Sequence, residues 1–216
     1  LGMSTTFTPM LTVSGYGNHF ENLYLQHGTA AGDYVGTAIT GHRNTFKRVH
    51  FAGPLIAAQG GHASYQGVTV TATDTLFEEC IFGVGTIGRD ELTPNVTLNA
   101  PTNEYGYTMF KDCTFVLFAD DTDPYFVKVT NTAGVVVGEF DNCNFVCLSS
   151  NMAVKAAVAF TFTSGSTAAM LIHPNCRFTG VTALSNTAGG AFIQIPTTAF
   201  AAPNDHTALL TNVLSV

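Results

Sequence analysis

The sequence predicts an all-β protein built as a parallel β-helix of about six coils. Three observations predict this fold: a six-residue phrase that recurs at nearly even intervals, an alternating apolar run before each copy, and turn-forming residues between them. The phrase reads F-x-x-C-x-F, and it occurs in full at residues 77–82, 110–115 and 140–145. Recurrence at a period of about 20 to 50 residues is typical of solenoids, propellers and arrays.

Relaxed copies of the phrase extend the repeat on both sides. They lie at residues 20–25, 46–51 and 173–178, so the six copies end at residues 25, 51, 82, 115, 145 and 178. The steps between these ends are 26, 31, 33, 30 and 33 residues. One phrase in every 26–33 residues therefore predicts about six coils.

A second apolar run before each phrase predicts another strand in every coil. These runs are rich in Val, Ile, Phe and Thr and are bounded by Gly, Asn, Asp, Pro and Ser, which is typical of strands separated by sharp turns. The apolar pairs are Leu11/Val13, Ala38/Ile39, Val68/Val70, Val96/Leu98, Phe126/Val129, Phe160/Phe162 and Ile193/Ile195. No segment has sustained helical spacing, and propeller blades need four hairpin-linked strands in a longer unit. A parallel β-helix with two or three strands in each coil fits better.

Stacking of the coils predicts two interior columns. Side chains two positions apart in a strand share a face, so the fourth and sixth residues of each phrase should both point inward. The first column contains Leu23, Val49, Cys80, Cys113, Cys143 and Cys176. The second column contains Leu25, Phe51, Phe82, Phe115, Phe145 and Phe178. The residue before each member of the first column is polar and should face outward. His173 replaces the first Phe of the sixth phrase, so Leu171 or Ile172 is expected to fill that corner.

The composition favours one domain that packs against copies of itself. The chain has 216 residues, of which 46% are hydrophobic and only 11% are charged. We predict a β-helix domain over residues 1–196 and a tail over residues 197–216 that caps the last coil or reaches a neighbouring subunit. Because the repeat starts close to Leu1, we also expect a segment upstream of it in the natural protein.

The charge balance argues against a nucleic-acid partner. The net charge is −7, and the chain has only eight Lys and Arg residues. Arg43, Lys47 and Arg48 form the one basic cluster, which we interpret as a solvated face rather than a phosphate-binding groove. No apolar run reaches the roughly 18 residues that a membrane-spanning helix needs, so no membrane partner is predicted.

The cysteine pattern predicts free buried thiols. Four of the five cysteines fall in the interior column, one in each of four coils, where Cys acts as a small apolar residue. Free thiols imply assembly in a reducing compartment. Neither C-x-x-C nor a His pair at ligand spacing occurs, so we expect no zinc site and no cofactor.

No group of residues predicts catalysis. Glycosidic chemistry needs carboxylates that converge on one groove. The richest acidic segment contains Asp120, Asp121 and Asp123, but it lacks the spacing and the glycine of a calcium loop, so a polar turn is favoured. Sugar sites usually present exposed aromatic side chains, and the best candidates are Tyr105 and Tyr107. These five residues are candidate glycan or partner contacts, and no enzyme is predicted.

Two stretches of the repeat resemble a known protein family. Residues 44–53, N-T-F-K-R-V-H-F-A-G, and residues 73–80, T-D-T-L-F-E-E-C, with T-I-G-R at 86–89, resemble tailed-bacteriophage virion proteins that have pectin-lyase-like folds. The resemblance extends over about residues 15–195. It implies a right-handed parallel β-helix in a structural, often trimeric, component of the particle that is attached through an N-terminal segment. It supplies no catalytic residue.

These observations lead to one expected function and two alternatives. We expect a capsid decoration protein or head spike that is assembled in the host cytoplasm, forms a homotrimer, and contacts the major capsid protein or other virion proteins. A tailspike-like receptor binder or depolymerase would use the same fold but needs a groove with converging carboxylates. A cellular adhesin or surface-layer protein would carry a signal peptide, which we do not expect here.

Overall fold

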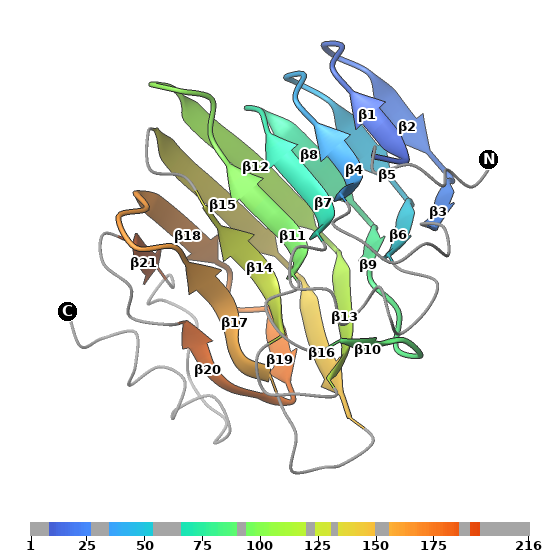
Figure 1. The fold of residues 1–216 in the computed structure, drawn as a ribbon, viewed down its shortest axis with the longest axis vertical. Coiled ribbons are helices and arrows are strands. Elements are labelled where there is room, and N and C mark those ends of the chain that lie inside the picture. The colour runs from blue at the N-terminus through green and yellow to red at the C-terminus, as the bar shows by residue number, and fades with distance from the viewer. Residues whose placement is uncertain are drawn as a thin grey trace.

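The computed structural model describes residues 9–26, 35–53, 66–89, 94–119, 124–130, 134–149, 156–185 and 191–194. Over these residues the chain forms strands and turns with no helix, and the strands stack in parallel as a β-solenoid (Figure 1). The predicted all-β, parallel β-helix fold is confirmed. The predicted tail over residues 197–216 lies outside the described residues. The described part of the chain contains no helix that is long and apolar enough to span a membrane.

Three parallel sheets form the walls of the solenoid. Sheet A contains, in order, β1 (Leu11–Val13), β4 (Val35–Ile39), β7 (Gln66–Thr71), β11 (Pro94–Asn99), β14 (Tyr125–Val129), β17 (Ala156–Phe162) and β20 (Val181–Ser185). Sheet B contains β2 (His19–Glu21), β5 (Thr45–Lys47), β8 (Thr75–Glu78), β12 (Tyr105–Lys111), β15 (Val135–Asp141), β18 (Ala168–Ile172) and β21 (Ala191–Gln194). Sheet C contains β3 (Tyr24–Gln26), β6 (His50–Gly53), β9 (Ile81–Phe82), β13 (Thr114–Ala119), β16 (Asn144–Leu148) and β19 (Arg177–Thr179), and the short β10 (Gly88–Arg89) pairs with β13.

Each coil passes through sheets A, B and C in turn, and β20 and β21 extend sheets A and B beyond the sixth coil. The sequence predicted that the apolar run at Ile193 and Ile195 takes the same place in its coil as the earlier runs, which lie in sheet A, and this prediction was wrong for Ile193. Ile193 lies in β21, which pairs with β18 in sheet B, whereas β20 is the last strand of sheet A. The reason is a tight corner: only Gly180 separates β19 from β20, and it has a φ of 75°. A Cβ atom at this position would lie 2.2 Å from the Cys147 carbonyl oxygen, so only glycine fits.

Alternation along the strands separates an apolar interior from a polar outer surface. In β15, Val136 and Phe140 are buried, whereas Glu139 and Asp141 are only partly buried. Successive side chains of a strand point to opposite faces. A shift of register by one residue would therefore move each Phe to the outer surface, and the burial of these rings fixes the register of the coils.

Two columns of stacked side chains run through the interior. In sheet C, Leu25, Phe51, Phe82, Phe115, Phe145 and Phe178 are paired in register from coil to coil. Neighbouring rings of this column stack at centroid distances of 5.1, 4.7, 4.6 and 4.5 Å. In sheet B, Phe20, Phe46, Phe77, Phe110 and Phe140 stack at 5.0, 5.1, 5.0 and 4.8 Å. Aromatic pairs of this kind contribute about 0.5–1.5 kcal/mol each beyond burial alone.

The corner between sheets B and C differs from the expectation that Cys and the last Phe share a strand. β8 ends at Glu78 and β9 begins at Ile81, so Cys80 lies between the strands. The residue before each of the first five members of the Cys column has a left-handed backbone, which bends the chain and turns both Cys and Phe inward. These residues are Asn22, Arg48, Glu79, Asp112 and Asn142, with φ of 57°, 52°, 54°, 55° and 52°. All five are exposed, as predicted.

The sixth corner is longer by one residue. Ile172 pairs with Phe140 and is 2% exposed, so it fills the interior position, one of the two options that the sequence left open. Three residues then precede Cys176, whereas two residues separate Phe140 from Cys143. A turn closed by the Cys176 amide and the His173 carbonyl, 3.0 Å apart, replaces the single left-handed residue. His173 therefore faces outward.

The thiols of the Cys column link neighbouring coils. The thiols of Cys80, Cys113, Cys143 and Cys176 each donate to the carbonyl oxygen of the first Phe of the preceding phrase, at 3.3–3.5 Å. All five cysteines of the chain are free and buried. Burial raises the pKa of the Cys113 thiol well above its ordinary value. The column is thus part of the core and is not a surface site.

Candidate functional site

The outer face of sheet B carries an ordered column of charged side chains. In each phrase the residue after the first Phe faces outward, and strand register places Glu21, Lys47, Glu78, Lys111 and Asp141 side by side in successive coils. In the sixth coil β18 ends at Ile172, and His173 is the next residue, so it continues this column just beyond the strand. We call these six residues the charge ladder. Because strands lie about 4.8 Å apart, each acidic side chain has basic neighbours and the sign alternates along the solenoid.

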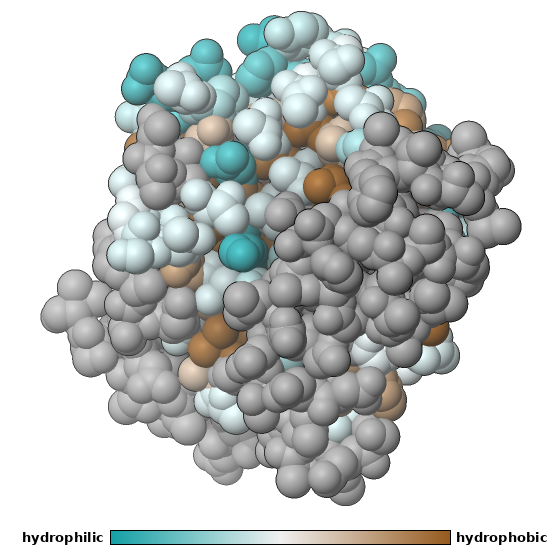
Figure 2. All heavy atoms as spheres, viewed as in Figure 1, coloured by the Kyte–Doolittle hydropathy of each residue, from teal (hydrophilic) through white to brown (hydrophobic). Residues whose placement is uncertain are grey.

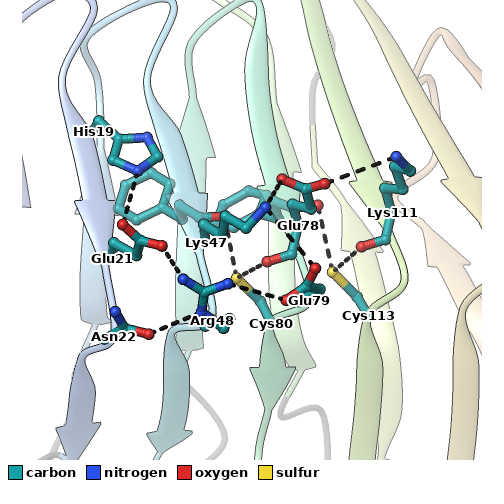
Figure 3. Close-up of polar contacts among 12 residues, drawn as sticks. His19, Glu21, Asn22, Lys47, Arg48, Glu78, Glu79, Cys80, Lys111 and Cys113 are labelled. Carbon is teal, nitrogen blue, oxygen red and sulfur yellow. Dashed lines mark hydrogen bonds and ion pairs between the residues drawn. The ribbon is translucent and has the colours of Figure 1, made fainter.

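Ion pairs connect the middle of the charge ladder (Figure 3). The Lys47 Nζ lies 2.9 Å from one carboxylate oxygen of Glu78, and the Lys111 Nζ lies 3.7 Å from the other. The hydrogen bond from Lys47 lowers the pKa of Glu78, and the same bond raises the pKa of Lys47. Both carboxylate oxygens of Glu78 are therefore engaged within the protein.

A second polar column follows the corner beside the charge ladder. Arg48 contacts Glu21 through its guanidinium, donates to the Asn22 side-chain oxygen at 2.9 Å, and lies 3.6 Å from Glu79 (Figure 3). The left-handed corner residues thus do more than bend the chain. Their side chains connect one coil to the next on the outer surface.

In the later coils, asparagine side chains connect one coil to the next on the outer surface. The Asn142 side-chain amide donates to Asp112 at 2.5 Å, and the Asn175 amide donates to Asp141 at 3.1 Å. Asp112 and Asp141 lie in separate columns, as expected. Both carboxylates thus accept a hydrogen bond from an asparagine of the next coil.

Tyr107, Glu139 and His173 form a hydrogen-bonded group across three coils. The Tyr107 hydroxyl donates to one oxygen of Glu139 at 2.5 Å, and the His173 Nε2 lies 2.8 Å from the other. Burial, together with the bond to Glu139, raises the pKa of Tyr107 to about 12. The bond from Tyr107, aided by His173, lowers the pKa of Glu139. Both oxygens of Glu139 therefore have partners, and the group links the three coils.

Apolar side chains surround this group on the outer face of sheet B. They occupy outward positions of β8, β12, β15 and β18, and we call them the sheet B patch. Its members are Leu76, Tyr105, Tyr107, Met109, Val135, Val137, Ala169 and Leu171. Tyr105 is 69% exposed, and the other seven are partly buried by their neighbours in the sheet. By comparison, the described surface in Figure 2 is mostly pale to teal, with brown residues in small separate areas. An exposed apolar patch with a charged border is typical of an interaction surface.

The structure describes two of the five predicted contact residues, and their role as contacts stays a prediction. Tyr105 and Tyr107 lie two positions apart on the outer face of β12, next to Glu139 in the neighbouring strand. Asp120, Asp121 and Asp123 lie outside the described residues. The interior residues of the Cys and Phe columns contact one another and present no binding surface.

Sequence reasoning did not identify the charge ladder or the role of Glu139. The signal for the ladder is present, because each Phe that begins a phrase is followed by Glu, Lys, Glu, Lys and Asp in successive coils. Glu139 has no such signal, since it precedes Phe140 and meets His173 only through register. Among the described residues, no group of three His, Cys, Asp or Glu side chains is arranged to hold a metal ion.

Comparison with known proteins gives no relative for this chain. No protein-family model matches it, and no curated protein or solved structure does. The fold therefore stands on the chain's own geometry, and the resemblance to virion proteins stays a prediction.

Proposed function

We propose that this protein is a non-enzymatic structural component of a bacteriophage particle, a capsid decoration protein or head spike that acts through rigid packing of its own copies. The observation that supports this proposal is the outer face of sheet B. It combines an apolar patch with charged groups that are already paired to one another, which suits a surface that is covered by protein rather than one that transforms a substrate.

The interior supports a mechanical role. Stacked rings run through the solenoid in two columns, and thiol hydrogen bonds join successive coils. Close packing makes such an interior resist deformation. A rigid prism keeps its outer faces in a fixed geometry, which is what repeated contacts on a particle need.

The paired carboxylates argue against the depolymerase alternative. Glu78, Glu139, Asp112 and Asp141 each have a partner within the protein. A catalytic pair would need one carboxyl group free to protonate a leaving group and another free to act as nucleophile or base.

One observation favours a receptor-binding protein as the second candidate. Tyr105 is strongly exposed and lies two positions from Tyr107, and exposed tyrosines suit both sugar rings and protein partners. The sheet B patch would then contact a glycan.

Light scattering on the purified chain tests the proposal first. We expect a mass of three times 22.8 kDa or a multiple of it. A stable monomer would contradict packing through copies and would support the receptor-binding candidate, which a glycan array then tests directly.

A further inference from the structure

We propose that the outer face of sheet B is the contact surface between two copies of the chain, which pack face to face with their solenoid axes antiparallel. This inference rests on the proposed oligomeric function, and it adds the surface, the partner and the orientation. Four observations on sheet B support it, and they concern the patch, the size of the face, the order of the charges and the residues that face each other at the centre of the patch.

The sheet B patch is the apolar centre of the contact. Its side chains lie on one continuous face, because register pairs Val137 with both Tyr107 and Ala169, and pairs Leu76 with Met109. Apolar side chains at the centre of an interface with polar groups at its border are the usual arrangement in stable complexes. The charge ladder supplies that border along one edge.

The face is large enough for a stable contact. It spans seven strands, which gives a length of about 29 Å, and its longest strands have seven residues and are about 24 Å long. Such a face offers on the order of 500–700 Å². That area is comparable with the roughly 800 Å² that each partner buries in a standard interface.

The order of charges favours another copy of the chain as the partner, and it favours one orientation of that copy. Along the solenoid the ladder reads Glu21, Lys47, Glu78, Lys111, Asp141 and His173. A second ladder that runs in the opposite direction, with the axis between the fourth and fifth coils, places Lys111 opposite Asp141 and Asp141 opposite Lys111. Unlike charges then meet on both sides of the axis, and His173 lies opposite Glu78.

The parallel arrangement leaves the ladder unmatched. If two copies met through sheet B with their axes parallel, the two-fold axis would run along the solenoid, and the ladder of each copy would face the far edge of the other copy's patch. Lys111 and Asp141 would then have no unlike charge of the second ladder opposite them, so the ladder favours the antiparallel geometry.

The centre of the patch lies between the fourth and fifth coils. A two-fold axis at this height, parallel to the strands, places Tyr107 against Val137 of the second copy, and Leu76 against Leu171 of the second copy. Facing sheets pack about 10 Å apart, a distance that side chains of this size fill. The two residues at the centre of the contact are thus apolar, and the charges lie beside them.

A two-fold contact has a consequence for the assembly. Every sheet B face pairs with one other, so the number of chains is even, and the trimer that the proposed function expects becomes a hexamer if it forms through other faces. A dimer would support the two-fold contact and contradict the trimer.

The first experiment places a charge at the centre of the contact. Val137→Lys and Leu76→Lys should each convert the assembly to half its mass in light scattering, with an unchanged circular dichroism spectrum. Val146→Lys is the matched control, because Val146 faces outward and is partly buried on sheet C, and it should keep the mass of the unaltered chain. Full mass in both sheet B variants would overturn the proposal.

The second experiment tests the orientation by cross-linking. Leu76 and Leu171 lie in the third and sixth coils, about 14 Å apart within one chain, but they are opposite each other between antiparallel copies. The double variant Leu76→Cys, Leu171→Cys should give a cross-linked species of twice 22.8 kDa with a bifunctional thiol reagent about 10 Å long, while Leu76→Cys alone should not. Cross-linking by Leu76→Cys alone would place the two Leu76 positions next to each other and would overturn the antiparallel arrangement.

The outcomes separate this inference from the proposed function. A mass of only three times 22.8 kDa supports the packing function and overturns the two-fold contact. A monomer overturns both.

Discussion

The side chains of Glu139 and His173 are joined across one coil, with 2.8 Å between the carboxylate Oε1 and the imidazole Nε2. The contact exists because the sixth corner has one extra residue, which lets Ile172 enter the core and turns His173 outward. An apparent defect in the repeat thus produces a polar link on the sheet B face.

Replacement of Glu139 should destabilise the later coils. Glu139→Gln keeps the shape but removes the charge that accepts hydrogen bonds from Tyr107 and His173. Hydrogen bonds to a charged group contribute about 1.5–3 kcal/mol, so we expect a loss of about 1–3 kcal/mol in the free energy of unfolding. Denaturant titration at pH 7 measures it, and Glu104→Gln, at an exposed position, is the control.

Alkaline pH should weaken the fold through Tyr107. Its pKa is about 12 in the folded protein, against about 10 for an unperturbed tyrosine. A raised folded pKa means that its contribution to stability is complete below about pH 10 and is lost as the pH rises through about 12. The difference in unfolding free energy between the unaltered chain and Tyr107→Phe should therefore shrink between these values, and a difference that stays constant would contradict the assignment.

Acid should weaken the charge ladder. The pKa of Glu78 is lowered in the folded protein by the hydrogen bond from Lys47, so the stability it supplies is present above the unfolded pKa of about 4.5 and is lost as the pH falls through the lower folded value. Lys47→Met removes the cause. Thermal melts from pH 7 to pH 3 should show that the unaltered chain and Lys47→Met converge at the acid end.

The thiols should be unreactive until the protein unfolds. All five are buried, so a thiol reagent should modify none in the folded chain and five in denaturant. Cys143→Ala removes the hydrogen bond to the Phe110 carbonyl and leaves a cavity, and we expect it to cost about 1–3 kcal/mol in unfolding free energy. Rapid modification of the folded chain would show that the column opens.

Substitutions of Asp112 at its left-handed corner should differ in their effect on stability. Asp112 has a φ of 55°, which glycine adopts without strain and a β-branched residue does not. Asp112→Val should therefore be less stable than Asp112→Gly by about 1–2 kcal/mol, although both lose the hydrogen bond from Asn142. Equal stability of the two variants in denaturant titrations would contradict this account of the corner.

The sequence alone determined the fold class and the interior. The spacing of Phe and Cys in each phrase recurs because each coil must present the same apolar side chains to the same column. The same short sequence pattern therefore appears in every repeat and can be recognised without the structure. Phe82, Phe115 and Phe145 could be placed in one column without any coordinates.

Only the tertiary structure decided the corners and the outer face. Cys80 was expected within a strand, but the left-handed backbone of Glu79 places it between two strands, and such a conformation has no strong signature in a Glu residue. Glu139 and His173 are 34 residues apart in sequence, and their contact depends on the register of two coils and on one extra residue in a turn. Short-range patterns determine which residues face outward, but register between coils decides which of them meet.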